Sequence, residues 1–79
     1  MAGEKEIYNA GYRQLVARLR EARKGLGLTQ QEVADRLGTG RTWVAKIEMC
    51  ELRLDLLHLV RLCGAYGLKA RKVIGVMEE

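Results

Sequence analysis

The stretch LTQQEVADRLGTGRTWVAKIE, residues 28–48, decides the fold of this 79-residue chain. It opens with a capping box, because the hydroxyl of Thr29 can accept the backbone N–H of Glu32 while the Glu32 side chain returns to the N–H of Thr29. This box predicts a helix over about 30–37, which Gly38 ends. The apolar side chains that this helix turns inward are Val33, Ala34 and Leu37.

The second half of the stretch predicts another helix over about 41–49, with Val44 and Ile47 facing inward. Gly40 stands at its N-cap position, where glycine is acceptable, and Thr39 is the alternative cap. Two helices of about eight residues joined by a short turn that contains glycine make a helix-turn-helix.

Upstream of this motif, apolar residues recur at steps of three and four, which predicts a helix from Tyr8 to about Lys24. Gly25 and Gly27 end this helix, and residues 1–7 are expected to be flexible. The apolar stripe consists of Tyr8, Tyr12, Leu15, Val16, Leu19 and Ala22.

Downstream, Asp55 is a good N-cap for a helix over about 56–66, and Gly67 is placed to end it. Its expected inner stripe is Leu56, Leu59, Val60, Cys63 and Tyr66. A shorter amphipathic helix follows over 69–79. The pattern therefore predicts an all-α fold of five helices, in one compact domain over 1–79.

The composition argues against an enzyme. The chain has no serine, a single histidine (His58) and two cysteines (Cys50 and Cys63), too few for a disulfide framework or a four-ligand zinc site. His58 and Cys63 are five residues apart and do not share a helical face, and we expect Cys63 to be a small core residue. We therefore expect no catalytic residue, no metal and no cofactor.

The ends and the apolar runs of the chain bear on where it resides. Residues 1–6 carry acidic side chains and lack an apolar segment, so they do not resemble a signal peptide. The apolar runs are too short to cross a membrane. We therefore expect a cytoplasmic protein with no membrane partner and no small-molecule ligand.

Positive charge is concentrated in the first half of the chain, although the net charge is only +4. Residues 11–46 hold eight Lys and Arg against three acidic residues, a net +5, whereas residues 47–79 hold five of each. Such asymmetry is typical of a chain that contacts a polyanion with one region, and a generic solvated basic surface is the alternative interpretation.

The motif resembles the Cro and phage-repressor type of helix-turn-helix regulators, the XRE family. The Leu-Thr-Gln entry at 28–30, the Leu-Gly turn at 37–38 and the Ile-Glu exit at 47–48 occur together at the spacing of that family. The resemblance extends from about Leu19 to Leu68. It implies a five-helix, lambda-repressor-like DNA-binding domain that binds double-stranded operator DNA, usually as a two-fold dimer.

In such a domain the helix over 41–49 lies in the major groove and presents its first residues to base edges. Arg41 can bond guanine O6 and N7 together, and Thr42 can bond a base edge or contact a thymine methyl. Lys46 reads guanine or contacts a phosphate. Trp43 either touches the DNA at the edge of the groove or packs half-buried against a neighbouring helix.

The resemblance also implies a set of backbone contacts. Gln30 matches the phosphate-contacting glutamine of the family, at a helix N-terminus that suits an anion. Arg23 is expected to contact a phosphate and to form an ion pair with Glu48, which would tie the first helix to the third. Arg53 is a further candidate for a phosphate contact.

Two positions depart from the family pattern. Cys50 stands where the family commonly has a glycine with positive φ, which costs on the order of 1 kcal/mol or forces another path of the chain. Leu54 stands where a proline often precedes the fourth helix. These departures put a phosphate contact from this loop in doubt, although Arg53 could supply one.

The C-terminal segments carry more apolar side chains than one inner stripe needs, because Leu57 and Leu62 lie off the stripe of the 56–66 helix. We expect a homodimer whose contact residues are Val73, Ile74, Val76 and Met77. A protein-interaction module, such as an antitoxin that binds a toxin, is the alternative function. The chain length favours a stand-alone Cro-like or controller regulator, and a piece of a longer protein is the alternative.

Overall fold

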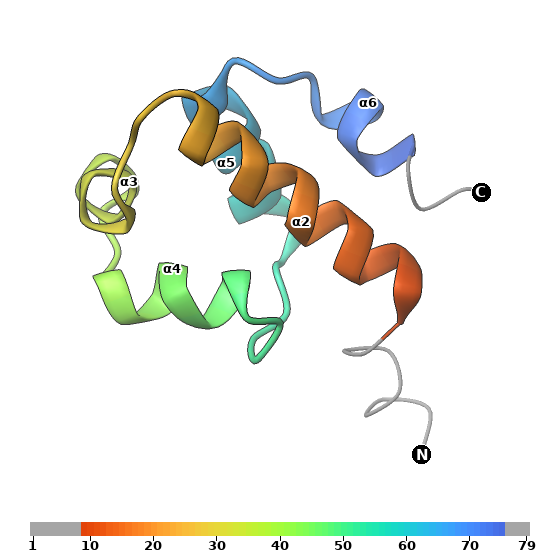
Figure 1. The fold of residues 1–79 in the computed structure, drawn as a ribbon, viewed down its shortest axis with the longest axis horizontal. Coiled ribbons are helices and arrows are strands. Elements are labelled where there is room, and N and C mark those ends of the chain that lie inside the picture. Colours follow the sequence, from red (N-terminus) through yellow and green to blue (C-terminus); the bar gives the residue numbers. More distant parts are fainter. Residues whose placement is uncertain (1–8, 76–79) are drawn as a thin grey trace.

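The computed structural model describes residues 9–75, and this part of the chain folds into five helices without a strand (Figure 1). Figure 1 shows α2 running across the molecule, with α3 and α4 on one side of it and α6 on the other. This arrangement confirms the all-α, five-helix prediction. The helices are α2 (Ala10–Gly25), α3 (Gln30–Leu37), α4 (Arg41–Glu48), α5 (Leu56–Tyr66) and α6 (Ala70–Ile74).

The helix boundaries follow from local capping. The predicted capping box is present, with Glu32 N–H donating to the Thr29 hydroxyl at 3.0 Å and Thr29 N–H donating to the Glu32 carboxylate at 2.8 Å. The Asp55 carboxylate accepts the His58 N–H at 2.7 Å at the start of α5. Gly38 and Gly67 end α3 and α5 with φ of 74° and 70°, which glycine adopts without strain.

The start of α4 differs from one expectation. Gly40 is its N-cap and no side chain caps this helix, so Thr39 does not serve as the alternative cap. The Thr39 hydroxyl is buried and has no hydrogen-bond partner among the described residues. The short turn is closed instead by the backbone, since Thr39 N–H donates to the Ala34 carbonyl at 2.9 Å.

One hydrophobic core joins all five helices. Its members from α2 include Leu15, Val16 and Leu19, which the sequence periodicity placed inward. The members from the other helices are Val33, Ala34, Leu37, Val44, Leu59, Leu62, Cys63, Tyr66 and Val73. Burial of these side chains holds the helix-turn-helix of α3 and α4 against α2 and α5.

The predicted inner stripe of α5 was partly wrong. Leu56 and Val60 are 70% and 49% exposed, whereas Leu62 is only 3% exposed. The side chains of α5 that face the core follow one another at steps of three and four, and this stripe is rotated from the expected one. They are Leu59, Leu62, Cys63 and Tyr66. Leu56 and Val60 therefore lie on the outer side of the domain.

The predicted dimer contact at Val73 was also wrong, because this side chain is fully buried in the core of its own chain. Ile74 is half-buried and packs against the same core. Val76 and Met77 lie outside the described residues. Between residues 9 and 75, no helix has both the length and the apolar character needed to cross a membrane.

Candidate nucleic-acid interface

The outer face of α4 carries the candidate base-reading side chains. Val44 and Ile47 face the core, which turns Arg41, Thr42 and Lys46 to the solvent. Arg41 and Thr42 are the first two residues of the helix. This arrangement suits a helix that enters the major groove by its N-terminal end.

A buried carboxylate connects the three helices around this face. Arg23 of α2 donates to Glu48 of α4 through Nε at 2.7 Å and through Nη2 at 3.0 Å. Gln30, the first residue of α3, donates its amide Nε2 to Glu48 Oε1 at 3.0 Å. Arg20 Nε lies 3.7 Å from the same oxygen. We call Arg20, Arg23, Gln30 and Glu48 the Glu48 cluster.

Arg23 has a mainly structural environment. Its side chain is 11% exposed, and its Nη1 donates to the Leu28 carbonyl at 2.8 Å in addition to the two bonds to Glu48. Hydrogen bonding to Glu48 raises the pKa of Arg23, which therefore stays charged. The ion pair that the resemblance implied is present in this geometry, whereas a contact of Arg23 with phosphate stays a prediction.

Gln30 links the Glu48 cluster to the reading face. Its Oε1 accepts a hydrogen bond from Arg41 Nη1 at 3.2 Å, while its Nε2 donates to Glu48. The opposite orientation of the amide would set its oxygen against a carboxylate and its NH₂ against a guanidinium, so the charged neighbours select the observed one. The sequence motif pointed to Gln30 and Arg41 separately, and the structure joins them.

Trp43 is half-buried and packs against the core rather than standing on the outer face of α4. Its ring contacts the imidazole of His58 with 4.8 Å between centroids, and His58 Nδ1 lies 3.0 Å from the Asp55 carboxylate. This packing matches the second of the two interpretations given for Trp43. His58 thereby joins α5 to α4.

Cys50 adopts the conformation that its position in the motif implied. Its φ is 60°, and among the described residues it alone has positive φ without being glycine. Cys50 N–H donates to the Ile47 carbonyl at 3.0 Å and Glu51 N–H to the Lys46 carbonyl at 2.8 Å, the bonding pattern of a Schellman turn. The chain thus follows the glycine path with a side chain in place. Cys63, by contrast, is a core residue, and burial raises the pKa of its thiol.

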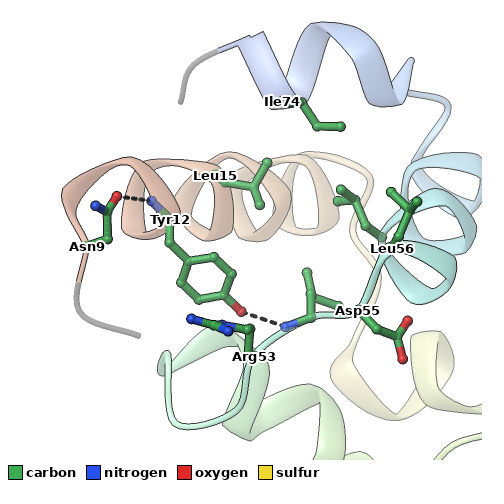
Figure 2. A pocket seen from close by; sticks show the side chains of 9 residues that line it. Asn9, Tyr12, Leu15, Arg53, Asp55, Leu56 and Ile74 are labelled. Atoms are coloured by element: carbon green, nitrogen blue, oxygen red, sulfur yellow. Dashed lines mark hydrogen bonds between the residues drawn. The ribbon is translucent and has the colours of Figure 1, made fainter. Parts of the chain in front are cut away.

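The Tyr12 hydroxyl is a feature that the sequence analysis missed. It donates to the Leu52 carbonyl at 3.0 Å and accepts the Leu54 N–H at 2.9 Å, so it holds the loop between α4 and α5 on both sides of Arg53. Figure 2 shows the second of these bonds as the dashed line that leaves the Tyr12 hydroxyl. The only available signal was a tyrosine in an apolar stripe, because a buried tyrosine needs a partner for its hydroxyl. Its partners, 40 and 42 residues away, could not be read from the sequence.

A groove of about 610 Å³ lies beside this loop, between α2, α5 and α6. Figure 2 shows Leu15, Leu56 and Ile74 around it, with Asn9, Arg53 and Asp55 at its edges.

Comparison with known proteins agrees with this geometry. A family model described as a helix-turn-helix domain matches residues 14–73. The chain is also similar to a solved structure, an XRE-family like protein from Pseudomonas syringae pv. tomato str. DC3000, with 36% sequence identity and a TM-score of 0.82. That match covers 99% of this chain and 95% of the other. No curated protein gives a significant match.

Proposed function

Because the chain belongs to the XRE-type family of helix-turn-helix regulators, which bind DNA, we propose that it controls transcription by binding a palindromic operator as a dimer, in the Cro-like or controller manner. The observation that carries the proposal is the hydrogen bond between Gln30 and Arg41, at the N-termini of α3 and α4. It sets a candidate phosphate contact and a candidate base reader side by side.

In this proposal α4 lies in the major groove. Arg41 bonds guanine O6 and N7 together, and the bond from Gln30 restricts the guanidinium before DNA arrives, which lowers the entropy cost of that contact. Thr42 contacts the neighbouring base, and Lys46, one turn further along the same face, contacts a guanine or a phosphate. Trp43 supports the helix from its inner side and reaches DNA only at its edge.

Phosphate contacts fix the register of the protein on the duplex. Gln30 keeps a second amide hydrogen besides the one given to Glu48, and the N-terminus of α3 adds backbone N–H groups. Arg53 contacts the phosphate backbone of the DNA from the loop after α4. Arg23 acts mainly by holding Glu48, and thereby Gln30, in place.

The dimer face that we propose lies on α5 rather than at Val73. Leu56, Leu57 and Val60 are exposed there, and no charged residue interrupts this run of three apolar side chains on the outer side of the helix. A second copy in antiparallel orientation would bring the acidic N-terminal side of one α5, at Asp55, near the basic segment that starts at Lys69 of the other. A different protein partner, such as a toxin, is the competing occupant.

Selection from random duplex oligonucleotides, followed by binding assays on the selected site, tests the proposal. We expect Arg41→Ala to relax base preference at one position and Gln30→Ala to weaken binding to all sites more evenly. Arg18→Ala is the matched control, because Arg18 is exposed on the side of α2 next to Leu68, away from Glu48. Failure to select any sequence at low salt, together with a stoichiometric protein partner, would favour the interaction module instead.

A further inference from the structure

Arg53 lies in a loop whose backbone is held by hydrogen bonds to a side chain of another helix. The Schellman turn that ends α4 satisfies the N–H groups up to Leu52, which donates to the Lys46 carbonyl at 3.3 Å. The next peptide groups, the Leu52 carbonyl and the Leu54 N–H, are bonded by the Tyr12 hydroxyl. A single hydroxyl from α2 therefore fixes both peptide groups that flank Arg53.

The hydroxyl is suited to this role. Tyr12 is buried and its ring fills the core between α2 and the loop, so its position is fixed by packing. Burial raises the pKa of Tyr12, so the hydroxyl keeps the proton that it donates to Leu52. The Leu54 N–H occupies the remaining acceptor site.

The departure from the family pattern at Leu54 has a consequence here. A proline, which often stands at this position in the family, has no N–H and could not donate to Tyr12. Leucine restores the donor, and the bond of 2.9 Å uses it. The loop of this chain is thus held by a hydrogen bond where a proline would stiffen the chain by itself.

We propose that Tyr12 is a positioning residue that holds Arg53 for a phosphate contact, by bonding the peptide groups on either side of it. The proposal rests on the proposed function, since it requires that Arg53 contacts DNA. Arg53 is exposed in the loop that follows α4, five residues after that helix ends at Glu48, and Figure 2 shows its side chain beside Tyr12. In the proposed complex the phosphates that flank α4 pass this loop.

The dependence of binding on salt concentration tests this role. Each phosphate neutralised by a cation contributes about 0.9 to the slope of log K against log[salt]. We expect Arg53→Ala to make the slope shallower by about that amount. Tyr12→Phe keeps the ring and every charge, and we expect it to lose most of the same slope while base preference stays unchanged. In the double variant the slope should equal that of Arg53→Ala.

A matched control separates positioning from general destabilisation. Val73→Ala opens the core at α6, far from the loop in sequence and without a change of charge, so it should lower the thermal midpoint and leave the slope unchanged. Folding of each variant at the assay temperature is checked by far-UV circular dichroism. In the unaltered protein, the Leu54 amide should exchange slowly with deuterium, which tests the bond without any substitution.

Any of four results would overturn the proposal. The first is a Tyr12→Phe protein that keeps the full slope while Arg53→Ala loses part of it. The second is a Val73→Ala protein that loses as much slope as Tyr12→Phe. The third is a Leu54 amide that exchanges as fast as an unfolded one. The fourth is an Arg53→Ala protein with an unchanged slope, and the Arg41 and Gln30 variants would then decide separately whether the proposed function still stands.

Discussion

Replacing Cys50 by glycine and by alanine measures the strain that the turn after α4 stores. At φ of 60° an L-residue pays roughly 1–2 kcal/mol relative to glycine. Glycine loses more conformational freedom than alanine on folding, and this opposes the gain by about 0.5–1 kcal/mol. Both variants lose the half-buried thiol equally, so that packing loss cancels in their difference. We therefore expect Cys50→Gly to exceed Cys50→Ala in the free energy of unfolding by about 0.5–1 kcal/mol.

Urea denaturation and thermal melting followed by circular dichroism provide the measurement. In a domain of this size 1 kcal/mol corresponds to a shift of about 4–8 °C, so the glycine variant should melt roughly 2–8 °C above the alanine variant. The urea m-values should agree, because neither change alters the surface exposed on unfolding.

Gly25→Ala is the control, because at this position alanine rather than glycine is expected to give the higher free energy of unfolding. Gly25 ends α2 without positive φ, and a Cβ built there meets no atom within 4 Å. Gly25→Ala should therefore stabilise the protein by about 0.5–1 kcal/mol. If alanine equals or exceeds glycine at position 50 while Gly25→Ala behaves as expected, the turn does not store the strain that its φ implies.

Three further substitutions test the Glu48 ion pair, the Asp55 cap and the exposed face of α5. Glu48→Gln should lower the free energy of unfolding by on the order of 2 kcal/mol, because it leaves the Arg23 guanidinium buried without a counter-charge; a urea midpoint equal to that of the unaltered protein would contradict this. Hydrogen bonds from His58 lower the pKa of Asp55 in the folded protein. The stabilisation from this cap is therefore fully present above the pKa that Asp55 has in the unfolded chain, and it is lost as the pH falls through the lower pKa of the folded protein. Asp55→Asn should therefore flatten the loss of stability on acidification from about pH 5, and an acid limb as steep as before would refute the assignment. Leu57→Lys should shift sedimentation equilibrium toward the monomer, and an unchanged dimer content would exclude this face of α5.

The parts of the fold that the sequence predicted depend on residues close together in the chain. The Thr29 and Glu32 capping box spans three residues, and the glycines at 38 and 67 act on their own backbone. Local rules suffice for such features. The helix-turn-helix was therefore predictable almost to the residue.

The face of α5 was not predictable in this way. Six of its first eight residues are apolar, so two overlapping stripes fit the helical period. The choice between Leu62 and Val60 as a core residue depends on where α2 and α6 lie against the helix, which periodicity does not contain. The same reasoning explains Val73, whose burial depends on how α6 returns to the core.

The site shows the same division between local and long-range information. Motif spacing selected Gln30 and Arg41 one by one, but their hydrogen bond depends on the angle between α3 and α4. Tyr12 was assigned to the apolar stripe, and only the fold brings its hydroxyl to a loop 40 residues away. Polar contacts across such distances carry no periodic signal in the chain.

These contacts also change how the charge of the first half should be counted. Residues 11–46 carry a net +5, but Arg23 is paired with Glu48 inside the domain and Arg20 approaches the same carboxylate. The cations that α4 presents to the solvent are Arg41 and Lys46. Since the salt slope counts phosphates neutralised rather than net charge, it should reflect these side chains and Arg53, and it should be smaller than the composition of the basic half suggests. A charge count locates the interface, whereas the Glu48 cluster decides which cations are left to form it.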